Sequence, residues 1–403
     1  MLLVWGLKQV LRVGCLGMVD ADGRHYRIGR QDGGPAVTVR LHDRAIQRKL
    51  LLNPDLYFGE AYMDGRLTLV EGTLEELFEL LLRNLRADGA LPFTCFLDRW
   101  IAPILQRVRS YNPIGRARRN VAHHYDLSAE LYDIFLDSER QYSCAYFASE
   151  NDSLEIAQRN KMRHIAAKLL LRPGQRVLDI GCGWGGLALY LARTCAVDVT
   201  GLTLSTEQHG YATARAAALG LSDRVRFHLR DYREEAGQYD RIVSVGMFEH
   251  VGLPHFRQFF DKVRELLDPQ GVALLHSIGR LQGPGRTSPW IDKYIFPGGY
   301  IPALSEVMPA VERCGLLPTD LEILRLHYAC TLKEWRRRFL AERERAARLY
   351  DERFCRMWEF YLTGSEIFFR HCGGMVFQLQ LSRALEAVPV TRDYMQSWEA
   401  QQV

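Results

Sequence analysis

The chain has 403 residues, which allows two or three domains at roughly 150 residues per domain. Apolar residues make up 47% and charged residues 25%, a composition that is ordinary for a globular protein. The formal net charge of +4 is small, so the overall charge does not indicate nucleic acid as a partner. The nine cysteines form no C-x-x-C pair, which is typical of reduced thiols in a cytosol, and we predict no metal site.

The opening stretch, MLLVWGLKQVLRVGCLG, is apolar but too short to span a bilayer. No basic region precedes its apolar run, as one would in a signal peptide. No other segment approaches the ~20 unbroken apolar residues of a transmembrane helix. If this protein acts on lipid, we therefore expect it to do so from the membrane surface.

Residues 1–85 predict a small α+β domain. Short strand-like runs such as AVTVRL (36–41) alternate with turns, and a capping box from Thr73 to Glu76 precedes an apolar helix. Residues 86–120 are interpreted as a connector that is rich in proline and carries a basic cluster of Arg116, Arg118 and Arg119. These arginines are placed to contact an anionic bilayer.

Strand-like and helical runs alternate over residues 121–403. The expected strands are RVLDIG, VDVTGLTL, RVRFHL, RIVSVGM and VALLHSI, and helices such as GGLALYLARTC and HFRQFFDKVRELL lie between them. This alternation predicts a parallel, doubly wound, Rossmann-like α/β sheet. The predicted fold is thus an α/β catalytic domain preceded by a connector and a smaller α+β domain.

A glycine turn follows the first of these strands, in VLDIGCGWGG (177–186). Gly181, Gly183 and Gly186 fit the pattern G-x-G-x-x-G, which places a nucleotide at the carboxyl end of a strand. A dinucleotide site needs an acidic residue near the end of the second strand, but GLTLSTEQ has no carboxylate there. Asp179 can balance a cationic ligand, which favours the sulfonium of S-adenosylmethionine over NAD.

Several short motifs occur in order: HYDLS, YSCAYF, LDIGCGWGG, GLTLSTEQ, MFEHVG, HSIG, YIFPGGYIP and HYACTL. Together they resemble the cyclopropane-fatty-acyl-phospholipid synthases and the related mycolic acid cyclopropane synthases. The resemblance covers residues 121–403, and LLNPDLYFGEAYMDGRL (51–67) looks like the additional domain of the phospholipid-acting members. The resemblance implies that the N-terminal domain docks phospholipid and helps to form a homodimer. Its apolar leading segment, with Trp5 and Lys8, suits an interfacial contact, and a buried first strand or helix is the alternative.

The resemblance also implies a reaction. The methyl carbon of S-adenosylmethionine adds across a cis double bond of a membrane phospholipid acyl chain, loses one proton and closes a ring. Such chemistry needs alignment of the methyl group with the alkene, shelter of a carbocation from water, and a base for one late proton. Family members hold a bicarbonate ion as that base.

By the same resemblance, the bicarbonate ligands are Cys144, Glu249, His276, Tyr328 and the backbone of Ile278 and Gly246. Each side chain also has a structural alternative: a helix N-terminal carboxylate for Glu249, a small buried apolar residue for Cys144, a core histidine for His276 and simple packing for Tyr328. His250 is assigned a structural role. Cys372 is a weaker candidate, because direct transfer to an alkene needs no covalent enzyme intermediate and nothing indicates a depressed thiol pKa.

The cofactor contacts implied by the resemblance are Tyr142, Ser143, Asp179, Gly181, Cys182, Gly183, Thr203, Leu204, Ser205, Gln208, Asp231 and Tyr232. Gln208 takes the place of the missing acidic residue at the ribose. Asp231 and Tyr232 fall where this fold usually holds adenine, and a solvated turn is their alternative. The aromatic insertion at 280–302 suits the wall of an acyl tunnel, or else core aromatics beneath a loop.

Three functions stay open at this point: cyclopropanation, methyl branching of acyl chains by the same first step, and lipid binding without turnover. The filled bicarbonate positions argue against the third. The first two share these motifs and differ in where the proton leaves. For all three, the expected location is cytoplasmic and peripheral, at the inner face of the membrane, with phospholipid and not nucleic acid as the partner.

Overall fold

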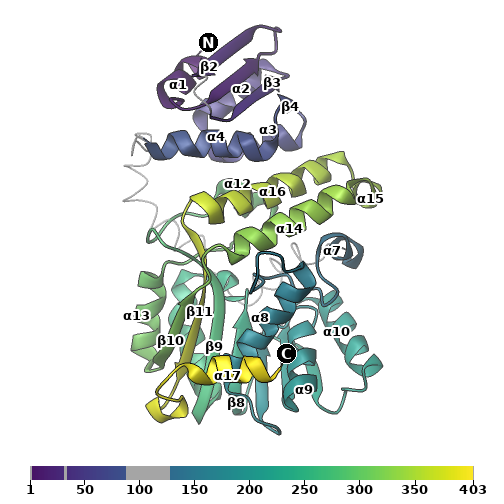
Figure 1. The fold of residues 1–403 in the computed structure, drawn as a ribbon, viewed down its shortest axis with the longest axis vertical. Helices are drawn as coiled ribbons and strands as arrows, with labels where there is room; N and C mark the ends of the chain where they lie inside the picture. Colours follow the sequence, from purple (N-terminus) through teal and green to yellow (C-terminus); the bar gives the residue numbers. More distant parts are fainter. Residues whose placement is uncertain (1, 31–33, 88–127, 403) are drawn as a thin grey trace. The chain divides into compact units, whose positions relative to one another are not determined.

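Figure 1 shows the computed structural model, which describes residues 2–30, 34–87 and 128–402. These residues divide into two compact units. Unit 1 takes in the described residues up to 87 together with Thr287–Ile295 and Leu332–Cys372, and unit 2 takes in the rest. Most of the predicted connector, with its cluster of Arg116, Arg118 and Arg119, lies outside the described residues.

The first part of unit 1 is a mixed sheet with helices, as expected for a small α+β region. The strand order is β2-β1-β3-β4, with β1 parallel to β3 and the other pairs antiparallel. The predicted capping box is present, because Thr73 N donates to Glu76 Oε2 at 2.7 Å and Glu76 N donates to Thr73 Oγ1 at 3.2 Å. The elements are α1 (Leu2–Val10), β1 (Cys15–Val19), β2 (His25–Gly29), β3 (Ala36–Leu41), α2 (Arg44–Leu52), α3 (Pro54–Met63), β4 (Leu67–Glu71) and α4 (Leu74–Ala87).

Unit 1 also contains helices from much later in the chain: α12 (Pro289–Tyr294), α15 (Arg343–Leu349) and α16 (Glu352–His371). An aromatic cluster joins them to the first part, with the Phe360 ring 5.4 Å from Phe58, 5.1 Å from Phe78 and 4.7 Å from Trp290. Gly59 makes room for this packing, since a Cβ there would lie 2.4 Å from the Trp290 indole. Thr287–Ile295 and Leu332–Cys372, which lie within the predicted catalytic domain, thus belong to unit 1.

Unit 2 is built on a seven-stranded sheet of order β10-β11-β9-β8-β5-β6-β7. The five strands expected from the sequence are present and parallel, which confirms the doubly wound α/β prediction. Two further strands, β10 and β11, extend the sheet by antiparallel pairing with β9. The strands are β5 (Arg176–Ile180), β6 (Asp198–Thr203), β7 (Val225–Leu229), β8 (Tyr239–Val245), β9 (Leu267–Arg280), β10 (Leu317–Ile323) and β11 (Gly374–Ser382).

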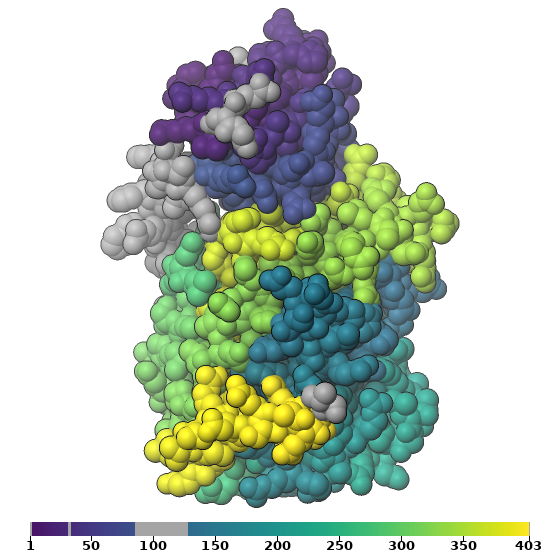
Figure 2. All heavy atoms as spheres, viewed as in Figure 1, coloured from purple at the N-terminus to yellow at the C-terminus, as the bar shows by residue number. Residues whose placement is uncertain are grey.

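Helices cover both faces of this sheet, so alternate residues of a strand enter different cores. Val177 of β5 belongs to the core with α8 and α9, whereas Leu178 belongs to the core with α11 and α13. The C-terminal helix α17 packs on α8 at the surface of unit 2 (Figure 2). The helices are α7 (Ala129–Phe135), α8 (Leu154–Leu169), α9 (Gly186–Cys195), α10 (Thr206–Ala218), α11 (Phe256–Leu266), α13 (Leu304–Cys314), α17 (Asp393–Gln401) and the first turn of α14 (His327–Ala341).

The parallel strands of unit 2 all end at the same edge of the sheet, where the loops after β5, β6 and β8 meet. Short 3-10 helices follow two of the strands: η1 (Tyr232–Glu234) comes after β7, and η2 (Phe248–His250) and η3 (Leu253–His255) come after β8. In open α/β sheets, ligands bind at this edge. Within the described ranges, no helix is both long and apolar enough to cross a membrane.

Candidate active site

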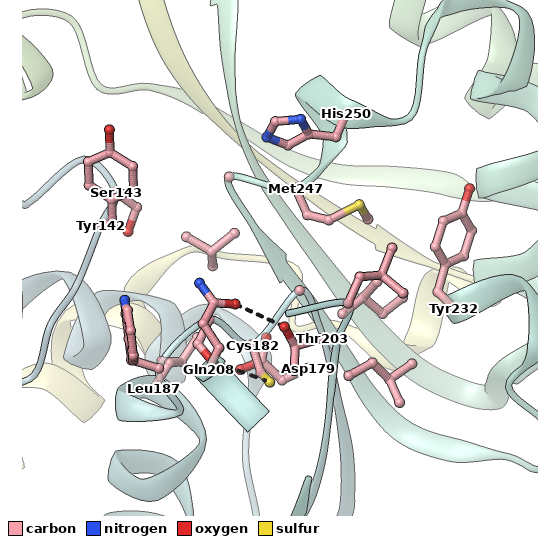
Figure 3. Close-up of a pocket in the computed structure, with 18 of the residues that line it drawn as sticks. Tyr142, Ser143, Asp179, Cys182, Leu187, Thr203, Gln208, Tyr232, Met247 and His250 are labelled. Atoms are coloured by element: carbon pink, nitrogen blue, oxygen red, sulfur yellow. Dashed lines mark hydrogen bonds between the residues drawn. The ribbon is translucent and has the colours of Figure 1, made fainter. Parts of the chain in front are cut away.

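A pocket lies in unit 2 at the carboxyl ends of β5, β6 and β8 (Figure 3). Its lining contains nearly every residue that the sequence predicted for the cofactor: Tyr142, Ser143, Asp179, Gly181, Cys182, Gly183, Thr203, Leu204, Gln208, Asp231 and Tyr232. Ser205 is the exception; it is buried and caps α10 by accepting from Gln208 N at 3.3 Å. Gly246, predicted as a contact of the base, lines the same pocket.

The glycine turn after β5 forms one wall of this pocket. Gly181 and Gly183 have φ values of +83° and +52°, which residues with a side chain rarely adopt. A Cβ on Gly181 would lie 2.7 Å from the Cβ of Met247. The amides of Gly181 and Cys182 both donate to Leu202 O at 2.9 Å, which fixes the turn to the end of β6.

Asp179 is a buried carboxyl group in the wall of the pocket. Its side chain is 1% exposed, and its Oδ2 has no hydrogen-bond partner among the described residues. Burial raises the pKa of Asp179 to about 7, although the Lys161 ammonium opposes that rise. A buried carboxylate oxygen without a partner at a pocket wall fits a cationic ligand, because such a ligand would restore the lost solvation.

The polar side chains after β6 and β7 are already held in place. Gln208 Oε1 accepts from Thr203 Oγ1 at 2.9 Å (Figure 3). Asp231 is 2% exposed and pairs with Arg233 at 2.7 Å, and the Tyr232 ring packs edge-on against Phe259 at 5.4 Å. The alternative of a solvated turn at Asp231 and Tyr232 is therefore wrong, since both side chains are buried.

A second polar cluster lies where β8 and β9 end. Glu249 Oε1 accepts from Ile278 N at 2.6 Å, and Gly246 N donates to His276 O at 2.9 Å. Glu249 Oε2 is buried and accepts no hydrogen bond from the described residues. Burial raises the pKa of Glu249 to about 7, against hydrogen bonds from the Ile278 amide and the Ser277 hydroxyl. The structure thus brings four of the predicted base-site positions together.

His276 is buried and neutral. Burial lowers its pKa well below the usual value, and the Lys161 charge adds to this effect. Its Nδ1 lies 3.2 Å from Nε2 of Gln378, which faces it across the β9–β11 ladder. An amide nitrogen can only donate, so Nδ1 accepts and the imidazole proton lies on Nε2.

Cys144 and Tyr328 lie in two segments that contact each other. Ala145 N donates to Thr331 Oγ1 at 3.0 Å, and Phe147 N donates to His327 Nδ1 at 3.0 Å. The chain around Cys144 is therefore bound to the first turn of α14, which carries Tyr328. Burial raises the pKa of the Cys144 thiol, with a smaller opposing effect of Lys161, so the thiol is neutral.

Cys372 is far from these residues in the sequence and does not belong to the same unit. It caps the C-terminus of α16 and belongs to unit 1. It is not among the residues that line the pocket. Cys144, Glu249, His276, Ile278 and Tyr328 do not line it either, so Gly246 is the one predicted base-site position in the pocket wall.

Residues 114–379 match a family model described as mycolic acid cyclopropane synthetase. The chain belongs to the mycolic acid cyclopropane synthetase family. Residues 19–87 match a second model, which is described as a domain of unknown function. The family match confirms the resemblance that the ordered motifs predicted.

Named relatives of this synthetase family cover most of the chain. The chain is 37% identical to a cyclopropane-fatty-acyl-phospholipid synthase of Escherichia coli strain K12, over 91% of this chain and 95% of the relative. It is 36% identical to the tuberculostearic acid methyltransferase UfaA1 of Mycobacterium tuberculosis, over 87% of this chain and 83% of the relative. A solved structure of the mycolic acid cyclopropane synthase CmaA1, complexed with SAH and CTAB, is 34% identical and superposes with a TM-score of 0.63, covering 67% of this chain and 98% of that chain.

The sequence analysis did not identify two residues that lie in or beside this site. His250, which the sequence assigned to structure, lines the pocket, and burial lowers its pKa to about 4 (Figure 3). Lys161 of α8 is fully buried and donates to Gln141 Oε1 and Ser143 Oγ, each at 2.7 Å. No sequence motif marks Lys161, because a lysine on a helix is ordinarily a solvated residue.

Proposed function

We propose that this protein transfers a methylene group from S-adenosylmethionine to cis-unsaturated acyl chains of membrane phospholipids, forming cyclopropane rings. The observation that carries the proposal is the pair of buried carboxylates, Asp179 and Glu249, each with one oxygen that lacks a partner among the described residues. Asp179 lines the cofactor pocket, and Glu249 belongs to the polar cluster where β8 and β9 end. We call that cluster of Gly246, Glu249, His276 and Ile278 the base-site cluster. The relative named as a cyclopropane-fatty-acyl-phospholipid synthase supports the substrate class.

The cofactor pocket fits S-adenosylmethionine. When bound, this cofactor supplies an electrophilic methyl carbon on a cationic sulfur. Asp179 balances positive charge, the glycine turn permits close approach of the ligand, and Gln208 offers polar atoms where a dinucleotide site would have a carboxylate. Asp231 and Tyr232 form the wall proposed for adenine. The relative that was crystallised with SAH, the demethylated form of the cofactor, supports this assignment.

We assign the bicarbonate ion to the base-site cluster together with Cys144 and Tyr328. Glu249 Oε2 in its protonated form, the His276 Nε2–H and the Tyr328 hydroxyl would donate to this ion, and all three side chains are buried. The Cys144 thiol donates to Ala145 O at 3.3 Å and would have to rotate to join them. The Ile278 amide is engaged by Glu249, so in this arrangement it orients that carboxyl group. The late proton of the reaction leaves toward this cluster, and burial keeps the neighbouring thiol and imidazole uncharged.

The acyl tunnel is proposed for the insertion at 280–302, but two of its aromatic residues have structural roles. Trp290 is buried against Gly59 and Phe360 within unit 1. Tyr300 is buried in unit 2 and donates to Glu306 Oε1 at 2.7 Å. For these two residues the core alternative holds, and the remaining residues of the insertion carry the proposal.

We propose further that the enzyme works as a peripheral protein at the cytoplasmic face of the membrane and as a homodimer. Helix α1 leaves Leu2 and Trp5 exposed and carries Lys8 in its last turn, as expected for an interfacial contact. Flotation with vesicles of anionic or zwitterionic phospholipid tests the first statement. Light scattering of the purified protein tests the second.

The reaction itself is tested with trideuteromethyl-labelled cofactor and unsaturated phospholipid vesicles. Ring closure removes one hydrogen from the added carbon, so the acyl product should retain two deuterium atoms by mass spectrometry. Retention of all three would exclude cyclopropanation and favour methyl branching, the second candidate, which the relative named tuberculostearic acid methyltransferase supports. Absence of any added carbon would favour a lipid-binding role.

A further inference from the structure

Lys161 is a buried cation without the usual counter-charge. Its side chain is 0% exposed and its ammonium donates only to neutral oxygens, Gln141 Oε1 and Ser143 Oγ. Within the part of the chain that the structure describes, no carboxylate lies within ion-pair distance of it. Burying an ammonium costs several kcal/mol unless other groups compensate. A buried charge with this energetic cost is a candidate functional group.

The second buried lysine of the same helix shows the ordinary arrangement. Lys168 is also 0% exposed, but it forms an ion pair with Glu322 and lies 3.7 Å from Asp320. Lys168 is thus neutralised inside its own network. Lys161 and Lys168 therefore form a matched pair on α8, one with carboxylate partners and one without.

Lys161 is bonded to the segment that runs from the cofactor pocket to Cys144. Its two acceptors, Gln141 and Ser143, line the pocket, and Ser143 directly precedes Cys144. After burial, Lys161 has the largest effect on the pKa of both the Cys144 thiol and the His276 imidazole. The carboxylates of Asp137 and Asp179, which lie beyond ion-pair distance, oppose the effect of burial on the pKa of this ammonium. Burial lowers the pKa of Lys161 only to about 8, so it is charged at neutral pH.

We propose that Lys161 supplies the positive charge that retains the anionic base beside Cys144, Glu249 and His276. This inference rests on the proposed function, in which that base is bicarbonate. The neutral thiol and imidazole donate hydrogen bonds to an anion but bring no charge, and Glu249 repels an anion whenever it is ionised. Lys161 acts through its potential without touching the reacting atoms, so it is a positioning residue.

The competing explanation is structural: Lys161 merely ties α8 to the segment that carries Gln141 and Ser143. The two explanations differ in which ligand they affect. If the role is structural, losing the hydrogen bonds to Gln141 and Ser143 disturbs two residues of the cofactor pocket and weakens SAH binding. A lost charge weakens the binding of a small anion and leaves SAH, which has no sulfonium, nearly unaffected.

The test uses the full-length protein as wild type, Lys161→Met, Lys161→Gln and the matched control Lys168→Met. Methionine keeps the stem and removes the charge, whereas glutamine also keeps a hydrogen-bond donor. Binding of ¹³C-bicarbonate is measured by NMR line broadening without lipid or cofactor. SAH binding is measured by calorimetry on the same samples, and thermal unfolding reports folding.

Both Lys161 variants should bind bicarbonate about tenfold more weakly or worse, the scale of one charge acting at an effective dielectric constant of about 20. Their SAH affinity should change less than about threefold. Lys168→Met should lose thermal stability, because Glu322 loses its partner, and should keep bicarbonate affinity within about threefold.

Unchanged bicarbonate binding in both Lys161 variants would overturn the inference and leave the proposed function intact. Parallel weakening of bicarbonate and SAH, or restoration of both by Lys161→Gln, would make Lys161 a structural tie. If the wild type turns over substrate but binds no bicarbonate, the identity of the base in the proposed function is wrong, and the inference falls with it.

Discussion

Asp179 and Glu249 are both carboxylates that the fold keeps in an unfavourable state. Each is buried, and burial raises the pKa of each to about 7. Each also has one oxygen without a hydrogen-bond partner among the described residues. Perturbed groups of this kind cluster at functional sites, because the ligand and not the protein completes their solvation. Burying these two carboxylates lowers the stability of the protein, and this is why they indicate a functional site.

Glu249→Gln should therefore stabilise the protein while removing most of its turnover. The folded chain holds a proton that the unfolded chain releases between about pH 4.5 and 7, so the free energy of unfolding falls as pH rises through that window. Glutamine cannot ionise, so the variant should be more stable by about 3 kcal/mol near pH 8 and unchanged near pH 4. Urea unfolding at both pH values measures this difference.

Glu265→Gln is the matched control, since the Glu265 side chain is 63% exposed and its replacement should change neither stability nor turnover. Cofactor binding should survive in Glu249→Gln. Loss of SAH binding in that variant would instead move Glu249 into the cofactor site.

The turn between β5 and α9 shows how a single element positions the cofactor pocket. The turn must leave the strand, pass close to the loop after β8 and open a helix within a few residues. Gly181 makes this path possible, because its positive φ and the nearby Met247 leave no room for a side chain. The two amides that bond Leu202 O then hold the turn against β6.

Gly181→Ala should weaken SAH binding at least about tenfold and cost about 1–3 kcal/mol of stability, from backbone strain and the clash with Met247. Gly174→Ala separates the two causes. Gly174 has a similar φ of +79°, but a Cβ there would meet nothing within 4 Å. The control should lose stability through strain alone and keep its SAH affinity in calorimetry; equal loss of affinity in both variants would contradict this account.

The whole molecule consists of two units whose chain segments interleave. Unit 1 draws α12 and α16 from the second half of the chain, and the aromatic cluster around Phe360 joins them to α3 and α4. Unit 2 has its own cores on the two faces of the sheet. Because each unit has a separate core, we expect damage to one core to leave the other unit folded at moderate temperature.

Phe360→Ala should destabilise unit 1 by about 3–5 kcal/mol, since it removes a ring that contacts several aromatic neighbours. SAH binding, a property of unit 2, should persist. Phe259→Ala is the reciprocal variant, because Phe259 packs against Tyr232 beneath the pocket, and it should weaken SAH binding. Calorimetric unfolding with and without SAH distinguishes these outcomes. If Phe360→Ala abolished SAH binding, the two units would not unfold separately.

Several features of this protein are determined by its sequence, because they depend on residues close together in the chain. The strand runs, the capping box at Thr73 and the glycine turn at Gly181 each follow from local periodicity or local geometry. Parallel strands end at one edge, so the order of the motifs also predicted most of the pocket lining.

Other features were decided only by tertiary contacts between distant segments. Lys161 is buried because the chain near Gln141 closes over α8, and α16 joins unit 1 because aromatic residues from α3, α4 and α12 surround Phe360. The Asp231 carboxylate is paired with Arg233, whereas Glu249 Oε2 has no hydrogen-bond partner among the described residues. This difference depends on which groups the fold brings next to each carboxylate. Burial and its electrostatic consequences are properties of the whole packed structure, so no local pattern contains them.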